Sequence, residues 1–177
     1  MQIPQVSVYC ATSIDGYIAR RDGALDWLDA ANAVPNEDYG YAAFMDTVDT
    51  VLLGRGTYDK VLEMGWWPYA PRRVVVLTSR PLPRSPHAVE THDGPLKPLL
   101  ARLGEQGSKR VYLDGGAAVR GGLREDVVDD MIVSVMPVLL GDGLPLFGPG
   151  TPELAWRSSS VRQYGEGLMQ LRWERRR

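Results

Sequence analysis

Short apolar runs, each followed by a polar or glycine-rich stretch, recur along the chain. Residues 6–11 (VSVYCA) are rich in β-branched side chains and predict a first strand. Residues 51–53, 74–77 and 111–113 form three more runs of the same kind and predict three further strands. Continuous apolar strands of this length are typical of a sheet that is covered on both faces.

Apolar residues at helical spacing lie between these runs and predict helices. Asn36 is expected to cap the first helix, with Asp38 in its first turn, where the helix dipole favours anions. Gly65 and Gly104 are expected to end the second and third helices, and residues 117–123 predict a fourth. The first three apolar stripes are Tyr41, Phe44, Met45 and Val48; Tyr58, Val61 and Leu62; and Leu96, Leu99, Leu100 and Leu103.

The last third of the chain has a different pattern. Residues 127–140 are rich in strand-forming side chains but contain Pro137, which marks an edge, a bulge or a strand end because proline donates no ladder hydrogen bond. Residues 154–161 and 167–173 predict two strands joined by a glycine-containing turn, an antiparallel hairpin. We therefore expect the whole chain, residues 1–177, to form a single α/β domain with a mixed sheet and helices on both faces.

Composition narrows the class of protein. Hydrophobic residues make up 44% of the 177 residues and charged residues 24%, which excludes a disordered, collagenous or coiled-coil chain. No apolar run approaches the roughly 20 residues of a membrane helix, and the first residues lack the pattern of a signal peptide. We therefore expect a cytoplasmic protein that does not bind membranes. The formal net charge of −2 provides no overall field for nucleic acid, which is not expected as a partner.

Cysteine and histidine are scarce. Cys10 is the only cysteine, so the sequence offers no intrachain disulfide and no cysteine zinc cluster, and we expect this residue inside the first strand. His87 and His92 are the only histidines, and we expect both to be exposed beside a proline-rich loop. Their number disfavours a histidine-rich metal site or a Ser/His/Asp triad, so no metal is expected.

Three loops that follow predicted strands carry anion-binding chemistry. Residues 54–58 (GRGTY), 78–80 (TSR) and 114–118 (DGGAA) combine glycines, hydroxyls and arginines. Two of them lead into a predicted helix, whose first N–H groups are unpaired and attract phosphate. Each also has a simpler reading: a capped helix with a surface arginine, a polar turn before Pro81, and a glycine turn without ligand. The chain has neither a P-loop nor a G-x-G-x-x-G fingerprint, but three such loops at strand ends favour a nucleotide site.

Six segments recur in the order of a known family. They are 13–19 (SIDGYIA), 22–28 (DGALDWL), 53–58 (LGRGTY), 77–80 (LTSR), 114–117 (DGGA) and 137–147 (PVLLGDGLPLF). With them the chain resembles the dihydrofolate reductase-like superfamily over most of its length. The resemblance is strongest to the C-terminal reductase domain of the bifunctional riboflavin-biosynthesis deaminase-reductase. It implies a three-layer α/β/α dihydrofolate reductase-like fold with a mixed central sheet and a C-terminal antiparallel hairpin.

The resemblance further implies NADPH as the cofactor, a small molecule as the substrate and a homodimer formed through the late strands. An arginine near the adenosine ribose is also the physical route to a preference for NADPH over NADH. The implied cofactor contacts are Gly54, Arg55 and Thr57 at the adenosine-side phosphates; Thr78, Ser79 and Arg80 around the 2′-phosphate and adenine; Gly115, Gly116 and Ala117 at the pyrophosphate; and Ala11, Gly16, Tyr17, Ile18 and Ala19 beside the nicotinamide.

Two carboxylates are candidates for the proton donor that a reductase often needs. Asp38 lies on the helix where folate-reducing members of the superfamily carry a carboxylate that binds the pteridine, and it fits a simple first-turn acid equally well. Asp15 follows the first strand and fits an Asp-Gly turn equally well. Trp27, Trp66 and Trp67 are expected to wall the site of a flat heterocycle, with ordinary packing as the alternative reading.

We therefore expect an NADPH-dependent reductase that resembles the 5-amino-6-(5-phosphoribosylamino)uracil reductase of riboflavin biosynthesis and transfers a hydride to a small heterocyclic or carbonyl substrate. A dihydrofolate reductase and a non-catalytic nucleotide-binding module are the alternatives. No arginine matches the one that holds the glutamate tail of folate, which disfavours the first of these. The zinc deaminase signature H-x-E…P-C-x-x-C is absent, so we expect a stand-alone reductase or a relative with another substrate.

Overall fold

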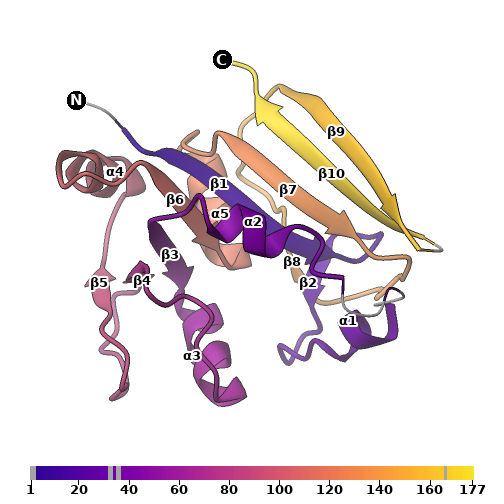
Figure 1. Ribbon diagram of the computed structural model, residues 1–177, viewed down its shortest axis with the longest axis horizontal. Coiled ribbons are helices and arrows are strands. Elements are labelled where there is room, and N and C mark those ends of the chain that lie inside the picture. Colours follow the sequence, from indigo (N-terminus) through magenta and orange to yellow (C-terminus); the bar gives the residue numbers. More distant parts are fainter. Residues whose placement is uncertain (1–2, 32–33, 35–36, 166) are drawn as a thin grey trace.

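The computed structural model describes residues 3–31, 34, 37–165 and 167–177 (Figure 1). Its helices are α1 (Asp26–Ala31), α2 (Tyr41–Met45), α3 (Arg55–Met64), α4 (Leu96–Glu105) and α5 (Gly116–Arg124). The strands of its large sheet are β1 (Gln5–Thr12), β3 (Thr50–Gly54), β4 (Arg73–Leu77), β5 (Glu90–His92), β6 (Arg110–Asp114), β7 (Asp130–Val135), β9 (Trp156–Tyr164) and β10 (Leu168–Arg175). A separate small sheet pairs β2 (Tyr17–Ala19) with β8 (Leu144–Pro145).

The eight strands of the large sheet have the order β5-β4-β3-β6-β1-β7-β10-β9. The strands from β5 to β7 in this order run parallel, whereas β10 is antiparallel to both of its neighbours. The predicted mixed sheet and terminal hairpin are therefore confirmed. Because parallel strands end at the same end of a sheet, the loops after β1, β3 and β6 meet there. The first residue of β1 and the last residue of β10 lie at the opposite end (Figure 1).

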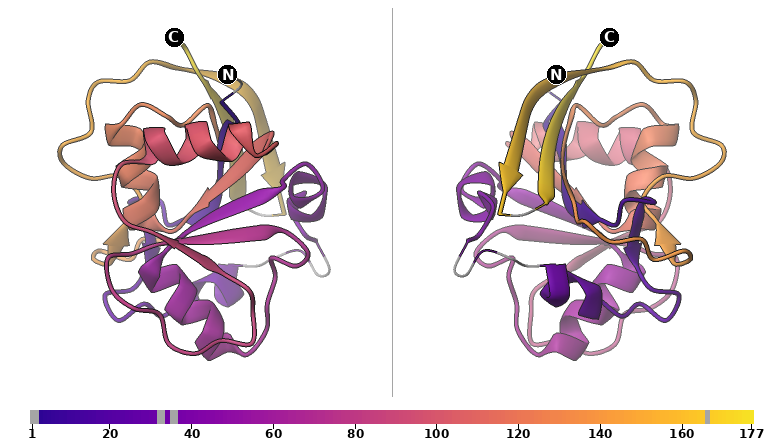
Figure 2. Two further views of the ribbon diagram at one scale, coloured as in Figure 1. Left: turned by 90° about the vertical axis from the view of Figure 1, so that its left-hand side faces the viewer. Right: turned by 90° about the vertical axis from the view of Figure 1, so that its right-hand side faces the viewer.

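Helices cover both faces of the parallel strands, as the apolar strands predicted. On one face, α4 and α5 pack against β1, β3 and β6, with Leu99 and Leu123 among the buried contacts. On the other face, α2 and α3 place Phe44 and Tyr58 against the same strands. The side views of Figure 2 show α3 on one side of the strands and α4 and α5 on the other. In the part of the chain that the structure describes, no helix is long and apolar enough to cross a membrane.

The first predicted helix is shorter than its apolar stripe. It begins at Tyr41 after Gly40, which adopts a left-handed conformation, and ends at Met45. Asp38 therefore precedes the helix instead of lying in its first turn, and its carboxylate accepts hydrogen bonds from the N–H groups of Gly40 and Ala42, 2.8 and 3.0 Å long. The predicted cap, Asn36, lies outside the described residues.

Two predicted boundaries move for identifiable reasons. The sequence predicted strand character up to residue 140, but β7 ends at Val135, because Pro137 has no N–H group to continue the ladder. Pro137 thus marks a strand end, one of the three possibilities that the sequence left open. Gly104 does not end α4, which continues to Glu105 and is followed by Gly107 in a left-handed conformation. Gly65 does end α3, also in a left-handed conformation.

Candidate functional site

A cavity of about 730 Å³ opens at the carboxyl ends of β1, β3 and β6. The last residues of β3 and β6, Gly54 and Asp114, lie in its wall, and Ala11 lines it from β1. The first turns of α3 and α5 and residues from α1, β2 and the loop after α3 complete the lining. The cavity thus gathers two of the three loops that the sequence predicted as anion-binding.

The two helix N-termini form a cradle without side chains to cap it. α3 follows Gly54 and α5 follows Gly115, and neither N-cap residue makes a side-chain hydrogen bond to its helix. The first N–H groups of each helix are therefore open to a ligand, and the helix dipoles favour an anion there. Both helices span at least nine residues, enough to carry an appreciable dipole.

Glycine is required at two positions of this cradle. Gly115 has a φ of +97°, and a Cβ at this position would lie 2.2 Å from Oγ1 of Thr57. A Cβ on Gly116 would lie 2.8 Å from Cδ1 of Ile18. The two glycines therefore let β2, α3 and α5 approach one another closely and leave backbone N–H groups as the surface. These observations fit the close approach of a pyrophosphate to the backbone.

Most of the residues predicted beside a cofactor line this cavity. Thr57, Gly54, Gly115, Gly116 and Ala117 lie at the cradle, and Ala11, Ile18 and Ala19 lie farther along the wall. Gly16 and Tyr17 belong to the adjoining turn and strand and are not part of the lining. The cavity also includes Arg120, on the second turn of α5, whose guanidinium donates a hydrogen bond to the carbonyl of Pro145.

The predicted contacts to the 2′-phosphate lie outside the cavity. The guanidinium of Arg55 donates to the carboxylate of Asp59 at 2.8 and 2.9 Å and to the carbonyl of Pro81 at 3.0 Å. The bond to Pro81 attaches α3 to the loop after β4. In that loop, the Thr78 hydroxyl accepts a hydrogen bond of 3.0 Å from the N–H of Arg80. Ser79 lies between Thr78 and Arg80 in the chain. These three residues and Arg55 are therefore close together outside the cavity lining, and their role stays a prediction.

One of the carboxyl groups that line the cavity is Asp114, at the end of β6. It accepts a hydrogen bond of 3.0 Å from the hydroxyl of Tyr69. Burial raises the pKa of Asp114, and this effect exceeds the lowering by hydrogen bonds from Tyr69, Tyr112 and the N–H of Gly115. Asp114 therefore retains its proton to a higher pH than an ordinary aspartate, as a proton donor must.

Four tyrosines line the cavity on the side of Asp114: Tyr9, Tyr41, Tyr69 and Tyr112. Burial raises the pKa of Tyr41 to about 12 and raises the pKa of each of the other three further above its ordinary value. All four phenols are therefore neutral near pH 7. Cys10 also lines the cavity, and burial raises the pKa of its thiol, which disfavours the reactive thiolate. Its position inside the first strand was predicted.

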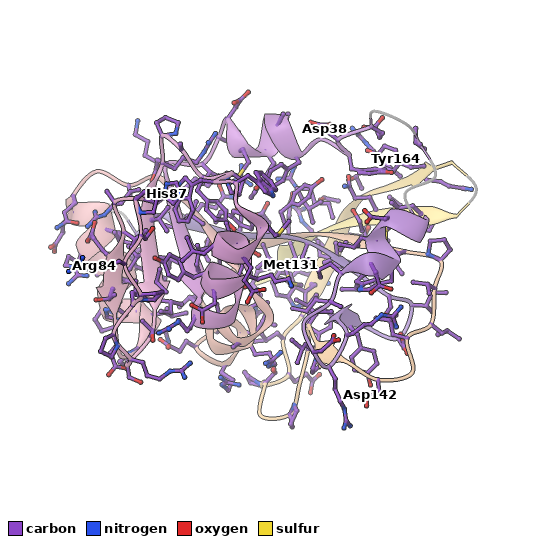
Figure 3. The ribbon with its side chains drawn as sticks, turned by 90° about the horizontal axis from the view of Figure 1, so that it is seen from below. Asp38, Arg84, His87, Met131, Asp142 and Tyr164 are labelled. Carbon is purple, nitrogen blue, oxygen red and sulfur yellow. The ribbon has the colours of Figure 1, made fainter. Side chains whose placement is uncertain are left out.

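The two carboxylates proposed from the sequence as proton donors do not line the cavity. Asp38 is exposed and accepts hydrogen bonds from the backbone at the start of α2; in Figure 3 it lies at the border of the molecule, near Tyr164. Asp15 is exposed and accepts hydrogen bonds from the Ser13 hydroxyl at 2.6 Å and from the N–H groups of Leu140 and Gly141. These bonds lower its pKa, so Asp15 fastens two loops together rather than storing a proton.

Of the three tryptophans expected to wall the site, only Trp66 lines the cavity, and it is 56% exposed. Trp27 is instead buried in a core cluster with Met136 and Leu168. Trp67 packs edge-on against Tyr69 and stacks on the ring of His87, with centroids 4.1 Å apart. Both tryptophans thus follow the ordinary-packing alternative.

Both histidines are half-buried, although the sequence predicted them to be exposed. His87 stacks on Trp67, and the ring of His92 contacts the carbonyl of Pro95. Among the described residues, no group of three or more histidine, cysteine, aspartate or glutamate side chains is placed to hold a metal ion. The chemistry of the cavity therefore comes from its backbone N–H groups, its phenols and the carboxyl group of Asp114.

The model of the RibD C-terminal domain matches residues 4–170 of the chain. The chain is 37% identical to the uncharacterized protein YwjB of Bacillus subtilis over 164 residues, 91% of this chain and 92% of that protein. A crystal structure from Shewanella sp. PV-4, of a protein assigned to riboflavin biosynthesis by name only, superposes with a TM-score of 0.90. The two chains are 35% identical, and the match covers 98% of this chain and 99% of that one.

Two more distant structures establish the fold. The deaminase/5-amino-6-(5-phosphoribosylamino)uracil reductase of Thermotoga maritima matches with a TM-score of 0.71 and 18% identity, and 97% of this chain covers 56% of that one. Dihydrofolate reductase of Enterococcus faecalis, solved with NADP(H), matches with a TM-score of 0.66 and 18% identity, covering 97% of this chain and 96% of that one. The expected dihydrofolate reductase-like fold is confirmed.

Proposed function

Because the chain belongs to the RibD C-terminal domain family, we propose that it is an NADPH-dependent reductase that transfers a hydride to a small heterocyclic or carbonyl substrate. One observation carries the proposal: a glycine cradle at two helix N-termini and a carboxyl group whose pKa is raised by burial lie in the same cavity. A nucleotide-binding module without turnover would need the cradle but would have no use for that carboxyl group.

The residues of the cavity fit the dinucleotide in two parts. The N–H groups of Gly115, Gly116 and Ala117, together with the Thr57 hydroxyl, would hold the pyrophosphate. Ile18, with Ala11 and Ala19 nearby in the lining, would border the nicotinamide. Arg55 and Arg80 would take the 2′-phosphate at the outer end, which would make the site prefer NADPH to NADH.

Reduction of a C=O or C=N group requires a hydride and a proton. NADPH, when bound, supplies the hydride with its electron pair to the carbon, and the π electrons move to the oxygen or nitrogen. Asp114 would donate the proton that this heteroatom takes up, and a solvent proton would restore the acid. Tyr69 holds the carboxyl group through its hydrogen bond of 3.0 Å and so fixes the direction of the transfer.

The similar enzyme of Thermotoga maritima is named for 5-amino-6-(5-phosphoribosylamino)uracil, so this pyrimidine is the first compound to test. Thermal unfolding with and without NADPH or NADH tests the cofactor. NADPH at about 100 times its dissociation constant adds about 2.7 kcal/mol, which raises the unfolding midpoint of a domain of this size by about 5–10 °C. We expect this rise with NADPH and little with NADH. A midpoint unchanged by either dinucleotide would overturn the proposed function.

We also propose that the protein is a homodimer that pairs through β9 and β10. β9 is the last strand of the sheet, and its outward side has no partner strand among the residues that the structure describes. Val161 on β9 and Met169 on β10 are 53% and 36% exposed. An unpaired strand with exposed apolar side chains is a natural surface for self-association.

A further inference from the structure

Most of the residues that line the cavity are uncharged. Besides the four tyrosines, Leu25 and Leu28 of α1 and Trp66 and Pro68 of the loop after α3 line the cavity. The tyrosines are neutral near pH 7, because burial raises the pKa of each. Aromatic and aliphatic side chains with a few fixed polar groups are the usual lining of a site for a small uncharged molecule.

Two of the three cations of the cavity wall are ion-paired, and the third lies beside the cradle. Arg21 forms an ion pair of 2.6 Å with Asp142 and projects into solvent, with 82% of its side chain exposed. Lys60 forms an ion pair of 3.3 Å with Glu63. Arg120, beside the cradle, donates to the carbonyl of Pro145. No other lysine or arginine of the described residues lines the cavity.

The carboxylates of the wall oppose an anionic substrate. Asp22, Asp59 and Glu63 line the cavity and equal its three cations in number, even when Asp114 is left out as the proton donor. A phosphate on the substrate would add to the negative charge of the cofactor, and its dehydration would have to be compensated by unpaired cations. Proteins usually provide one or more free arginines or lysines for this purpose. Among the described residues that line the cavity away from the cradle, every cation is in an ion pair.

We infer that the substrate is an uncharged, unphosphorylated ring compound with a reducible C=O or C=N group, rather than a phosphoribosylated pyrimidine. The inference rests on the proposed function, which supplies the cofactor and the reaction. The size of the cavity agrees with it. About 730 Å³ is the volume of a site for one drug-sized ligand, so the space beside a bound nicotinamide suits a single small ring.

The test is NADPH oxidation by the full-length chain. The substrates are 5-amino-6-(5-phosphoribosylamino)uracil, its dephosphorylated counterpart and a panel of uncharged cyclic ketones and imines. We expect at least one unphosphorylated compound to have a kcat/KM ten or more times that of the phosphate ester. A phosphate ester with a kcat/KM above that of every unphosphorylated compound overturns the inference. So does the absence of turnover with the whole panel in protein that NADPH stabilises. Absence of any NADPH effect on thermal unfolding would instead overturn the proposed function, which separates the two failures.

A variant tests the missing cation directly. Tyr41→Arg would place a guanidinium in the wall of the cavity, and Tyr41→Phe is its uncharged control. We expect Tyr41→Arg to raise the kcat/KM of the phosphate ester relative to its dephosphorylated counterpart by tenfold or more, and Tyr41→Phe to leave that ratio unchanged. An unchanged ratio in Tyr41→Arg, together with phosphate-ester turnover that inorganic phosphate inhibits competitively in the unsubstituted protein, would show that a phosphate site already exists.

Discussion

The hydroxyl of Tyr69 donates a hydrogen bond of 3.0 Å to Oδ2 of Asp114, although the two residues are 45 positions apart. The bond joins the loop after α3 to the end of β6, and both residues line the cavity. It also opposes the effect of burial, because a hydrogen bond to the carboxylate stabilises the ionised form. The proton affinity of the candidate donor is thus set jointly by the cavity and by Tyr69.

Replacing Asp114 by asparagine should remove the proton donor while keeping the shape of the side chain. We expect kcat to fall about 10²–10⁴-fold, with NADPH still raising the unfolding midpoint. The matched control is Asp38→Asn, which should leave kcat within about twofold, since Asp38 is exposed and accepts hydrogen bonds from the backbone at the start of α2. Equal losses in both variants would exclude Asp114 as the donor.

The same substitution predicts a pH-dependent change in stability. Burial raises the pKa of Asp114 in the folded protein above its value in the unfolded chain. The folded state therefore binds more protons between these two pKa values, and stability is lost as the pH rises through that interval. Asp114→Asn should remove this loss and be at least as stable as the unsubstituted protein at pH 7. Urea unfolding at pH 4 and pH 7 measures it, and a large loss of stability at pH 7 would contradict the burial argument.

Tyr69→Phe should shift the pH dependence of catalysis upward. The tyrosine hydrogen bond lowers the pKa of Asp114, so its removal raises that pKa further. Because the protonated form is the active one, kcat/KM should fall at a higher pH in the variant. Tyr58→Phe is the control, since the buried Tyr58 hydroxyl has no hydrogen-bond partner among the described residues. A kcat/KM that rises with pH, instead of falling, would mean that the ionised carboxylate is the active form.

Arg55→Ala tests the outer end of the dinucleotide site. Loss of a charged hydrogen-bond donor to a 2′-phosphate should weaken NADPH binding about 10–100-fold, whereas NADH, which lacks that phosphate, should be little affected. Asp59→Asn removes the partner of the guanidinium and keeps the guanidinium itself, so it should bind NADPH at least as well. Titration calorimetry with both dinucleotides gives the answer, and equal weakening of both would place Arg55 away from the 2′-phosphate.

Two adjacent glycines of α5 should respond in opposite directions to alanine. A Cβ on Gly122 would lie 2.6 Å from Cδ2 of Leu113, so Gly122→Ala should lower the free energy of unfolding by about 1–3 kcal/mol. Gly121 has open space around it, and Gly121→Ala should raise the free energy of unfolding by about 0.5–1 kcal/mol through helix propensity. Urea denaturation of the two variants measures both changes, and the same sign for both would contradict the packing of α5 on β6.

The proposed homodimer predicts that a charge at the β9 surface separates the subunits. Val161→Glu should convert the dimer to a monomer, as light scattering after size exclusion would show, because a carboxylate buried in an apolar interface is costly. Ser160→Glu is the control, since successive residues of a strand face opposite sides. A protein that is monomeric without any substitution would refute the homodimer.

The strands and the longer helices could be predicted because each spans several periods of its hydrophobic pattern. The runs at β1, β3, β4 and β6 are continuous and apolar, and the stripes of α3 and α4 lie on helices of ten residues each. The small elements α1, β2, β5 and β8 were not predicted, because two to six residues are too few to show a period. Their positions depend instead on tertiary contacts, such as the pairing of Tyr17 with Pro145.

The glycine cradle could be predicted from the sequence, whereas Asp114 as the candidate proton donor could not. Glycine and hydroxyl residues directly before a helix have a local meaning, so the loops after β3 and β6 were identified. Asp114 was visible in the segment DGGAA, but that segment was interpreted as an anion-binding loop and no role was given to its carboxyl group. Its chemistry depends on burial and on Tyr69, which comes from another loop. Asp15 and Asp38 were equally plausible candidates for the proton donor, because a short segment does not show whether its side chains are exposed.

Gln170 illustrates the same limit in the sheet. Along β10 the apolar residues Met169 and Leu171 would be expected to face the core, yet Gln170 is the more buried side chain. Its amide donates hydrogen bonds to the carbonyl of Tyr39 at 3.0 Å and to the Ser134 hydroxyl at 3.2 Å. Those partners make burial of a polar group tolerable, and they come from segments that no local pattern connects to β10.

Because both ends of the described chain emerge at the end of the sheet remote from the cavity, the architecture is suited to modular use. An affinity tag, a surface linker or a second catalytic unit could be attached at either terminus without crossing the mouth of the site. Oriented immobilisation through a C-terminal tag should therefore leave NADPH access intact, and the same geometry would let a fused partner evolve beside this domain at no cost to its chemistry.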